Sequence, residues 1–375
     1  MKSFPFKWFA VVGVLGWMVN AAMAADWPLF RGDRGLTGVA TGKFPDQPDL
    51  IWKYKVGDPV LATAVIGDGH VYFGADDGKV YCLKLADGEK VWEFKTKDPF
   101  EAPPMLLDGR VYVGDLFGNF FALNAKDGQQ VWKFETGAEI HGGANWITAP
   151  DGKSKYVLVG SHDNFLYALD AKNGEKKWEL ECEQPINGSP TLANSRTMFG
   201  GCDALLHLIN VKTGKRDKTI DAKSYIIASV AAQGDEAFVG HRDSEFLAFD
   251  LKAGKVKWSY KDRRFPYESS AAVTKDRVLF GGQDKRLHCV RRDNGEVVWT
   301  YATRGAVDSS PVVVDGKVIV GSNDDYVHMV TLAGGKEVWK FKTGDAVTAS
   351  PAVADSRVVI GSTDGFVYCF GAKKK

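Results

Sequence analysis

The chain repeats itself about every 40 residues, and one position of this repeat carries polar side chains that could bind a ligand. The eight residues at that position are Leu61, Glu101, His141, Asn187, Ile227, Glu268, Asp308 and Thr348. Three carboxylates, an imidazole and an amide converging on one axis would hold a cation or a polar ligand, and oxygen ligands of this type suit Ca²⁺. The alternative is a ring of solvated residues at the mouth of a water-filled channel.

Three arginines form a second candidate site, because their positions are not basic in the other repeats. Arg263, Arg264 and Arg304 are candidates for binding an acidic partner or an anionic ligand, and ordinary solvated charge is the alternative. By contrast, an acid recurs at one loop position, which favours a structural role as an acceptor of backbone N–H groups in the turn. These acids are Asp76, Asp163, Asp203, Asp243, Asp284, Asp324 and Asp364.

The histidines and cysteines give little sign of metal or nucleophile chemistry. His207, His288 and His328 stand where other repeats have tyrosine, so we interpret them as packing residues. Cys82, Cys289 and Cys369 share a strand position with alanines of other repeats and are expected to be small buried residues. We predict a disulfide between Cys182 and Cys202, which an oxidising compartment would permit.

These residues are positioned by a repeat that reads as β-strands punctuated by glycine. A leading glycine ends an apolar strand at positions 74, 114, 160, 200, 240, 281, 321 and 361. A turn glycine follows fourteen residues later in seven copies, and an aromatic strand residue follows after four more. That residue is Trp92, Trp132, Trp178, Trp258, Trp299 or Trp339, and Lys218 replaces it in one copy.

Four short strands per repeat and eight repeats predict an all-β fold, an eight-bladed β-propeller of four-stranded blades. The tryptophans are then structural plugs between blades. The last repeat lacks its own Trp strand, and Trp52 supplies it, so we expect residues 51–56 to pair with the strand ending at Phe370 and close the ring. The predicted organisation is a lead segment at 25–50, one propeller at 51–370 and a basic tail at 371–375.

The amino terminus predicts export. Residues 1–24 combine Lys2 and Lys7 with an apolar run and end in Ala22-Met23-Ala24, which has the form cleaved by signal peptidase. The apolar run of about a dozen residues is short of the about 20 needed for the alternative, a membrane anchor. With 48 basic and 47 acidic residues the chain lacks the positive excess of a nucleic-acid binder. We expect a monomer in the periplasm or outside the cell, without a transmembrane segment in the mature chain.

Two segments carry a family resemblance. Ala125 to Trp132 and Leu169 to Trp178 resemble the tryptophan-docking repeat of the pyrroloquinoline-quinone (PQQ) type propellers, and the resemblance runs over residues 51–370. This superfamily includes quinoprotein alcohol dehydrogenases and also cofactor-free propellers similar to BamB, a lipoprotein of the outer-membrane barrel-assembly machinery. The start Asp26 to Gly32 also resembles that of exported proteins with these repeats. The resemblance therefore implies the fold and leaves the function open.

Three functions follow as hypotheses. The leading one is an exported, non-catalytic scaffold that binds another exported or envelope protein and holds no cofactor. The second is a small PQQ- and Ca²⁺-dependent oxidoreductase, for which the resemblance implies Glu101, Asn187 and Asp308 as Ca²⁺ ligands. Against it, the chain lacks the long insertions and adjacent cysteines that enclose the quinone in those enzymes. The third is a small-molecule or glycan receptor that uses the funnel and Trp146.

Overall fold

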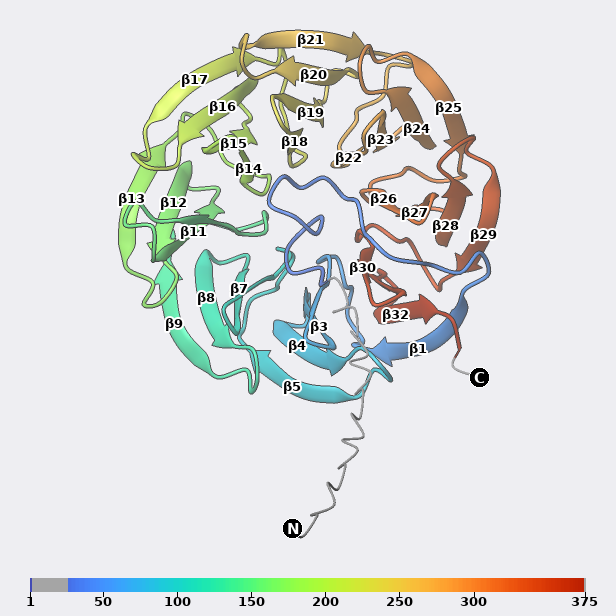
Figure 1. Cartoon of the computed structure of the whole chain (residues 1–375), viewed down its shortest axis with the longest axis horizontal. Coiled ribbons are helices and arrows are strands. Elements are labelled where there is room, and N and C mark those ends of the chain that lie inside the picture. The colour runs from blue at the N-terminus through green and yellow to red at the C-terminus, as the bar shows by residue number, and fades with distance from the viewer. Residues whose placement is uncertain (2–25, 374–375) are drawn as a thin grey trace.

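The computed structural model describes Met1 and residues 26–373, and the predicted signal segment beyond Met1 lies outside the described residues. Residues 26–373 form eight four-stranded antiparallel sheets arranged as the blades of a ring (Figure 1), which confirms the predicted eight-bladed propeller. Within this part of the chain no helix has the length and apolar character required to cross a bilayer.

The blades follow one another in chain order, and within each blade the strands run from the innermost to the outermost. Blade 1 consists of β2 (Val65–Gly67), β3 (His70–Ala75), β4 (Lys79–Lys84) and β5 (Lys90–Lys95). Blade 2 consists of β6 (Met105–Leu107), β7 (Arg110–Gly114), β8 (Asn119–Asn124) and β9 (Gln130–Glu135). Blade 3 consists of β10 (Asn145–Thr148), β11 (Lys155–Gly160), β12 (Phe165–Asp170) and β13 (Lys176–Glu181). Blade 4 consists of β14 (Thr191–Ala193), β15 (Arg196–Gly200), β16 (Leu205–Asn210) and β17 (Arg216–Asp221). Blade 5 consists of β18 (Ala231–Gln233), β19 (Glu236–Gly240), β20 (Phe246–Asp250) and β21 (Lys255–Tyr260). Blade 6 consists of β22 (Ala272–Val273), β23 (Arg277–Gly282), β24 (Arg286–Arg291) and β25 (Val297–Ala302). Blade 7 consists of β26 (Val312–Val314), β27 (Lys317–Gly321), β28 (Tyr326–Thr331) and β29 (Glu337–Lys342). Blade 8 consists of β30 (Ala352–Ala354), β31 (Arg357–Gly361), β32 (Phe366–Gly371) and β1 (Asp49–Lys55).

Burial follows the position of a strand within its blade. The middle strand β8 buries four consecutive residues, Phe120 to Leu123, because both of its faces pack against neighbouring blades. The outermost strand β5 alternates, with Trp92 buried and its neighbours Val91 and Glu93 exposed. The hydrophobic core therefore lies between the blades and encircles the channel.

The ring is closed by the two ends of the propeller sequence, as predicted. β1 pairs antiparallel with β32, and Trp52 lies opposite Cys369. The last blade thus takes three strands from the end of the chain and one from its beginning (Figure 1). Both of these strands gain a partner that neither would have in an open ring.

Six of the seven repeat tryptophans pack on the turn glycine of the following blade. A Cβ placed on Gly295 would lie 2.7 Å from the ring of Trp258, and Gly295 has a φ of +76°. The Trp258 indole N–H donates to the carbonyl oxygen of Arg292 in the same turn, at 2.9 Å. Where Lys218 replaces tryptophan, its ammonium group donates to the carbonyl oxygen of Ala253 at 3.2 Å. Lysine therefore keeps a hydrogen bond to the turn and loses the aromatic contact.

The lead segment, residues 26–40, crosses the central channel (Figure 1). Its backbone hydrogen-bonds to the innermost strands of six blades, through Ile66, Leu106, Leu192, Ala232, Val273 and Val313. These bonds use N–H and C=O groups that the innermost strands would otherwise leave unpaired. The chain then runs outward past blade 7, where Lys317 donates to the carbonyl oxygen of Phe44 at 2.9 Å, and enters β1.

Arg31 anchors this crossing segment. Its side chain is 1% exposed and donates to the carbonyl oxygens of Ser310 at 2.9 Å, Ala271 at 3.0 Å and Pro311. Burial lowers the pKa of Arg31 to about 9, although the nearby Asp33 carboxylate favours its charge. A buried cation held by carbonyl dipoles stabilises one orientation of the segment, because any shift would leave the charge without acceptors.

A belt of hydroxyl groups links successive blades around the channel. The backbone N–H of each member donates to the side-chain oxygen of the next, at 2.8 to 3.1 Å. The members are Ser189, Ser229, Ser270, Ser310, Ser350 and Thr63. Five such bonds fix the spacing of the innermost strands, and with it the positions of the loop residues that precede them.

Candidate functional site

The polar residues predicted to share a position do so in the structure. Each of the six, from Glu101 to Thr348, lies in the loop four residues before the innermost strand of its blade and is half-buried. We call this set the loop ring: Glu101, His141, Asn187, Glu268, Asp308 and Thr348. The face of the propeller that carries it is the loop face. The lead segment contacts the opposite half of the innermost strands, near the hairpins, so that end is the hairpin face.

One half of the loop ring is a continuous chain of contacts across blades 2 to 4. The Glu101 carboxylate lies 3.4 Å from Nδ1 of His141, and the imidazole rings of His141 and His162 have centroids 4.4 Å apart. His162 Nε2 then lies 2.7 Å from Oδ1 of Asn187, whose amide donates to Sγ of Cys202 at 3.1 Å. Burial lowers the pKa of His162, and the neighbouring His141 lowers it further.

An acid that the repeat pattern assigned to a turn lies beside this chain of contacts. In blade 1 the turn role belongs to Asp77, which accepts from the backbone N–H of Lys79 at 3.1 Å, and not to Asp76 as predicted. Asp76 Oδ1 is buried with no hydrogen-bond partner among the described residues. Burial, together with the nearby carboxylates of Glu101, Asp58 and Asp77, raises the pKa of Asp76 to about 6. The cluster of carboxylates in this part of the loop face therefore favours binding of a proton or a cation.

In the other half of the loop ring, Glu268 and Asp308 have side-chain partners, whereas the Thr348 hydroxyl is buried with no hydrogen-bond partner among the described residues. Glu268 accepts from Arg242 at 3.0 Å. Asp308 accepts from the side-chain amides of Gln283 and, at 2.7 Å, Asn323. Burial raises the pKa of Asp308, the Asn323 hydrogen bond opposes that rise, and Glu268 adds to it.

The proposed Ca²⁺ ligands Glu101, Asn187 and Asp308 do not form one donor set in this geometry. Each contacts a different group of neighbours, and neither Glu101 nor Asp308 belongs to any cluster of three acidic, His or Cys ligand atoms lying within 4.8 Å among residues 26–373. Ca²⁺ requires six to eight oxygens around a single centre. The residues present therefore do not fit a Ca²⁺–PQQ pair without rearrangement.

The loop face also carries exposed aromatic and basic side chains. Arg263, Arg264 and Arg304 are exposed, and none of them forms a side-chain ion pair within the described part of the chain. The loops beside them expose Phe265 at 45% and Tyr225 at 54%, and a loop of blade 2 exposes Phe117 at 73%. Sequence reasoning missed these three aromatics because each occupies a loop position where the repeat imposes no residue type.

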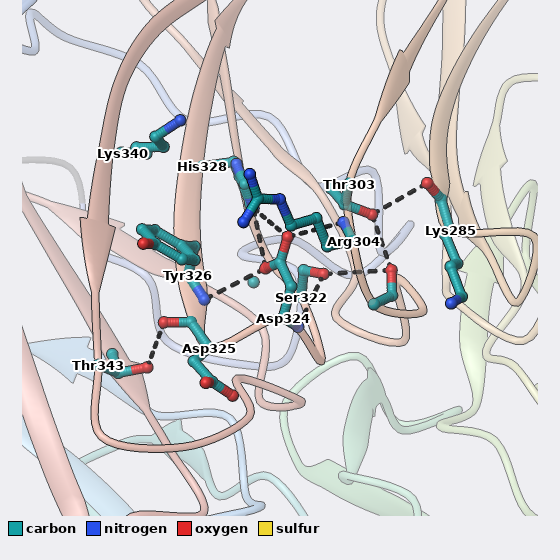
Figure 2. Close-up of polar contacts among 12 residues, drawn as sticks. Lys285, Thr303, Arg304, Ser322, Asp324, Asp325, Tyr326, His328, Lys340 and Thr343 are labelled. Carbon is teal, nitrogen blue, oxygen red and sulfur yellow. Dashed lines mark hydrogen bonds and ion pairs between the residues drawn. The ribbon is translucent and has the colours of Figure 1, made fainter.

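The repeated acids and histidines share one local structure. In blade 7 the Asp324 carboxylate accepts from the backbone N–H groups of Arg304 at 2.9 Å and Tyr326 at 3.3 Å, and it lies 3.0 Å from Nε2 of His328 (Figure 2). Asp163 and Asp364 form the corresponding bonds with Tyr167 and Tyr368, and Asp203 does so with His207. Histidine here replaces the tyrosine hydroxyl as the partner of the acid.

Besides Asp76, two members of the series differ from the prediction. The Asp243 side chain accepts no backbone N–H among the described residues, and its own N–H donates to Nδ1 of His241 at 3.1 Å. Asp284 pairs with His288 at 3.1 Å and accepts no backbone N–H within the same range.

The predicted disulfide between Cys182 and Cys202 is wrong for this structure, because both residues are free thiols. Their sulfur atoms face different neighbours. Cys202 Sγ accepts from Asn187 at 3.1 Å, whereas Cys182 Sγ accepts from Arg216 at 3.7 Å, and burial raises the pKa of Cys182 to about 11. Cys82, Cys289 and Cys369 are fully buried, as expected.

Trp146, the aromatic residue considered for a glycan receptor, is covered by cations of its own chain. The Arg34 guanidinium lies 4.4 Å and the Lys155 ammonium 4.8 Å from the ring centroid. A cavity of about 790 Å³ opens nearby on the hairpin face, where the lead segment meets β10, β14 and β18. A sugar ring could stack on Trp146 only by displacing one of these cations.

Comparison with solved structures gives BamB and two dehydrogenases among the matches. BamB from Moraxella catarrhalis matches with a TM-score of 0.70 at 19% identity, covering 88% of this chain and 98% of that one. Quinohemoprotein alcohol dehydrogenase from Comamonas testosteroni matches with a TM-score of 0.81 at 16% identity, covering 95% and 82%. A europium-containing methanol dehydrogenase matches with a TM-score of 0.76 at 12% identity, covering 93% and 98%. At these identities the likeness shows the fold alone.

Comparison with curated protein sequences gives no match. The sequence profile described as "Outer membrane protein assembly factor BamB" matches residues 44–260 and 263–333, which is more than half of the chain. The match begins just after the segment that crosses the channel and extends through blade 7 up to β29. On this match, with the eight PQQ-type blades described above, the chain belongs to the BamB-like family of PQQ-repeat β-propellers.

Proposed function

We propose that this protein is a non-catalytic scaffold of the cell envelope that binds another exported protein through its loop face. The observation that carries the proposal is the set of exposed aromatic side chains Phe117, Tyr225 and Phe265 on that face, together with unpaired arginines. Aromatic residues and arginine are the types most enriched at the centres of protein interfaces. Solvent exposure of three large aromatics on one face has no structural benefit for the isolated propeller.

The geometry of the channel supports binding of a macromolecule over binding of an enclosed substrate. The lead segment and Arg31 occupy the channel beneath the loop ring, and five of the six loop-ring residues contact neighbouring polar side chains. Small-molecule sites normally bury most of their ligand in a concave pocket. A broad face with protruding aromatics suits a protein surface better.

The family description supplies the class of partner. The profile is named for an outer membrane protein assembly factor, and the N-terminal sequence predicts export. We therefore propose that the protein acts in the periplasm and that its partner is a component that assembles outer-membrane proteins. The unpaired Arg263, Arg264 and Arg304 favour an acidic segment on that partner.

A pair of matched triple variants tests the proposal. The face variant is Phe117→Ser, Tyr225→Ser and Phe265→Ser, and the control is Val91→Ser, Val131→Ser and Val297→Ser, which changes three exposed residues on the outermost strands β5, β9 and β25. A photo-reactive crosslinker at Arg304 in each background identifies the partner in intact cells. We expect the wild type and the control to crosslink to one envelope protein and the face variant to lose at least 10-fold of the yield. Equal crosslinking in all three would show that the three aromatic side chains do not carry the binding, and no crosslink in the wild type would exclude the loop face around Arg304.

The second candidate is a quinoprotein oxidoreductase, which the match to quinohemoprotein alcohol dehydrogenase at a TM-score of 0.81 favours. It requires Glu101, Asn187 and Asp308 to reorganise around Ca²⁺ and PQQ. Calorimetric titration with PQQ and Ca²⁺ tests this directly. Saturable binding that a Glu101→Ala, Asp308→Ala double variant loses would support the enzyme, and absence of heat at every concentration would leave the scaffold.

A further inference from the structure

Blade 7 shows how the repeat normally satisfies its loop aspartate (Figure 2). Both oxygens of Asp324 have partners, since Oδ2 accepts from the Arg304 backbone N–H and Oδ1 from Tyr326 N–H. Thr303, which precedes Arg304, donates its hydroxyl to the carbonyl oxygens of Lys285 and Gly305, at 3.0 and 2.7 Å. The corresponding loop acids of blades 3 and 8 also accept a backbone N–H from the preceding linker, that of Gly137 or Gly344, at 2.7 Å.

Blade 6 lacks this arrangement. Its linker contains one extra residue, because seven positions separate Tyr260 from Tyr267 where six separate Tyr301 from Val307. Asp262 stands at the position that Thr303 occupies in the next linker, so a carboxylate replaces a hydroxyl. Blades 1, 2 and 7 likewise end in a threonine at this position, namely Thr96, Thr136 and Thr343, each with its hydroxyl bonded to backbone carbonyls.

The result is a buried carboxylate with one oxygen unused. Asp284 Oδ1 lies 3.1 Å from Nε2 of His288, whereas Oδ2 has no hydrogen-bond partner among the described residues. The side chains of Asp284 and His288 are both 0% exposed. A buried carboxylate oxygen without a donor is costly unless a cation neutralises it.

Asp262 completes a group of three donors. One ligand atom from each of Asp262, Asp284 and His288 lies within 4.8 Å of the others, and this is the one such cluster of acidic, His or Cys residues within residues 26–373. Asp262 is exposed and gives the group its access to solvent. Its other contact is the Arg286 guanidinium, at 3.1 Å from Oδ2.

The imidazole of His288 is held in position by its surroundings. Its ring stacks on Phe280, with centroids 5.2 Å apart and 11° between the planes, and the edge of Tyr267 lies at 5.3 Å. Nδ1 lies 3.0 Å from the hydroxyl of Tyr260. With the proton on Nδ1 and donated to that hydroxyl, Nε2 presents a lone pair toward Asp284, which is the second-shell arrangement found for metal-bound histidines.

We propose that Asp262, Asp284 and His288 bind one divalent transition-metal ion of the zinc class. One imidazole nitrogen with two carboxylate oxygens matches Zn²⁺, which accepts mixed N and O ligands, and not Ca²⁺, which takes oxygens. The separation of 3.1 Å between His288 Nε2 and Asp284 Oδ1 is close to the spacing of about 3.3 Å between two ligands of a tetrahedral ion with bonds of about 2.0 Å. Asp262 reaches the ion by a side-chain movement, with Arg286 remaining as its outer partner, and water fills the fourth position.

The ion would fasten the linker between blades 5 and 6 to the body of blade 6. Asp262 belongs to the linker that also carries Phe265, and both Asp284 and His288 belong to blade 6. The inference stands on these contacts and does not depend on what the loop face binds.

The test uses the full mature chain, without an affinity tag, after removal of metal by chelator. The decisive variant is Asp262→Thr, which restores the residue type of the other linkers and alters an exposed position, so the fold is retained. Asp276→Thr is the matched control, since it removes the same charge from an exposed residue at the hairpin end of blade 6. Zn²⁺ affinity is measured by competition with a chromophoric chelator, and Co²⁺ absorption reports the ligand set.

We expect the wild type and Asp276→Thr to bind one Zn²⁺ per chain, and Asp262→Thr to bind at least 10-fold more weakly and to lose the Co²⁺ bands. Equal affinities in the three proteins would place the ion elsewhere and overturn the proposal. Absence of Zn²⁺ binding in the wild type would also overturn it.

Discussion

Asp76 shows how a single residue outside the repeat pattern can acquire unusual properties. It stands one position before the acid that caps the turn in blade 1, so it receives no backbone donor and faces other acids instead. Burial and three neighbouring carboxylates raise its pKa to about 6. The folded protein therefore holds a proton on Asp76 at pH values where the unfolded chain has released it.

Removal of this charge is expected to stabilise the protein progressively above about pH 4, with the full gain above about pH 6. Because the folded pKa of Asp76 is raised above the ordinary 3.8, its contribution to stability falls as pH rises from about 4 to about 6. Asp76→Asn should raise the free energy of unfolding at pH 7.5 by up to about 1 kcal/mol, given partial solvent screening, and leave it unchanged at pH 3.5. Urea denaturation at the two pH values measures the difference.

The control is Asp87→Asn, which alters an exposed turn acid of the same blade and keeps an oxygen acceptor for the Glu89 N–H. A gain of equal size for Asp76→Asn at both pH values would contradict the assigned pKa. Equal effects of the two substitutions would do the same.

At the scale of the strands and turns, the contact between a tryptophan and the next blade's glycine is the repeated unit of stability. Six tryptophans and one lysine pack on seven turn glycines, which are Gly88, Gly128, Gly174, Gly214, Gly254, Gly295 and Gly335. Each of these glycines has a positive φ, and each would bring a Cβ into the facing side chain. The glycine is therefore required for both backbone conformation and space.

Two glycine substitutions separate these requirements. Gly295 and Gly316 have φ values of +76° and +72°, but a Cβ at Gly295 would lie 2.7 Å from the Trp258 ring, whereas nothing lies within 4 Å at Gly316. Gly316→Ala should lower the free energy of unfolding by about 1 kcal/mol, the cost of a left-handed alanine. Gly295→Ala should lower it by about 2–4 kcal/mol, because overpacking adds to that cost. Equal losses in denaturant titrations would show that the indole yields without cost.

At this scale the sequence predicted most of what the structure contains. The leading glycines locate the strand ends, and the spacing from Trp52 to Gly74 correctly indicated a strand shared between the two chain ends. The pattern failed where one residue changes the alignment. The linker into blade 6 has one extra residue, and Asp284 accepts no backbone N–H among residues 26–373, unlike the turn acid that the repeat predicts, whereas the predicted packing role of His288 is confirmed by its stacking on Phe280.

For the whole molecule, the lead segment was the feature that sequence patterns could not place. Residues 26–40 have no repeat, and they bind the innermost strands mainly through backbone groups, which carry no residue-type signal. The burial of Arg31 was equally hidden, because its acceptors are carbonyl oxygens of Ala271, Ser310 and Pro311, far along the chain. The predicted disulfide failed for a related reason, since spacing cannot give the direction of a side chain.

Deletion of residues 26–40 from the mature chain is expected to loosen the channel without opening the ring. The innermost strands of six blades lose backbone partners, and the free energy of unfolding should fall by at least about 3 kcal/mol at about 0.5–1.5 kcal/mol per hydrogen bond. Hydrogen exchange should accelerate at the amides of Leu192, Ala232, Val273 and Val313, which donate to the segment.

A synthetic peptide of residues 26–40 added in trans provides the control for this deletion. It should restore slow exchange at those amides, and the same peptide with Arg31→Ala should do so only at higher concentration. Unchanged exchange rates in the deletion variant would show that the segment contributes nothing to the inner strands.

The path of the lead segment also bears on how a chain of similar repeats forms a ring with a defined number of blades. Six of the eight contacts between neighbouring blades join a tryptophan to a turn glycine, so local packing alone does not specify a ring of eight blades. The lead segment hydrogen-bonds to Ile66, Leu192 and Val313 at the same time, so its length matches one diameter of the channel. A ring of seven or nine blades would hold these strands at other separations. The hydrogen bonds of the lead segment therefore favour a ring of eight blades.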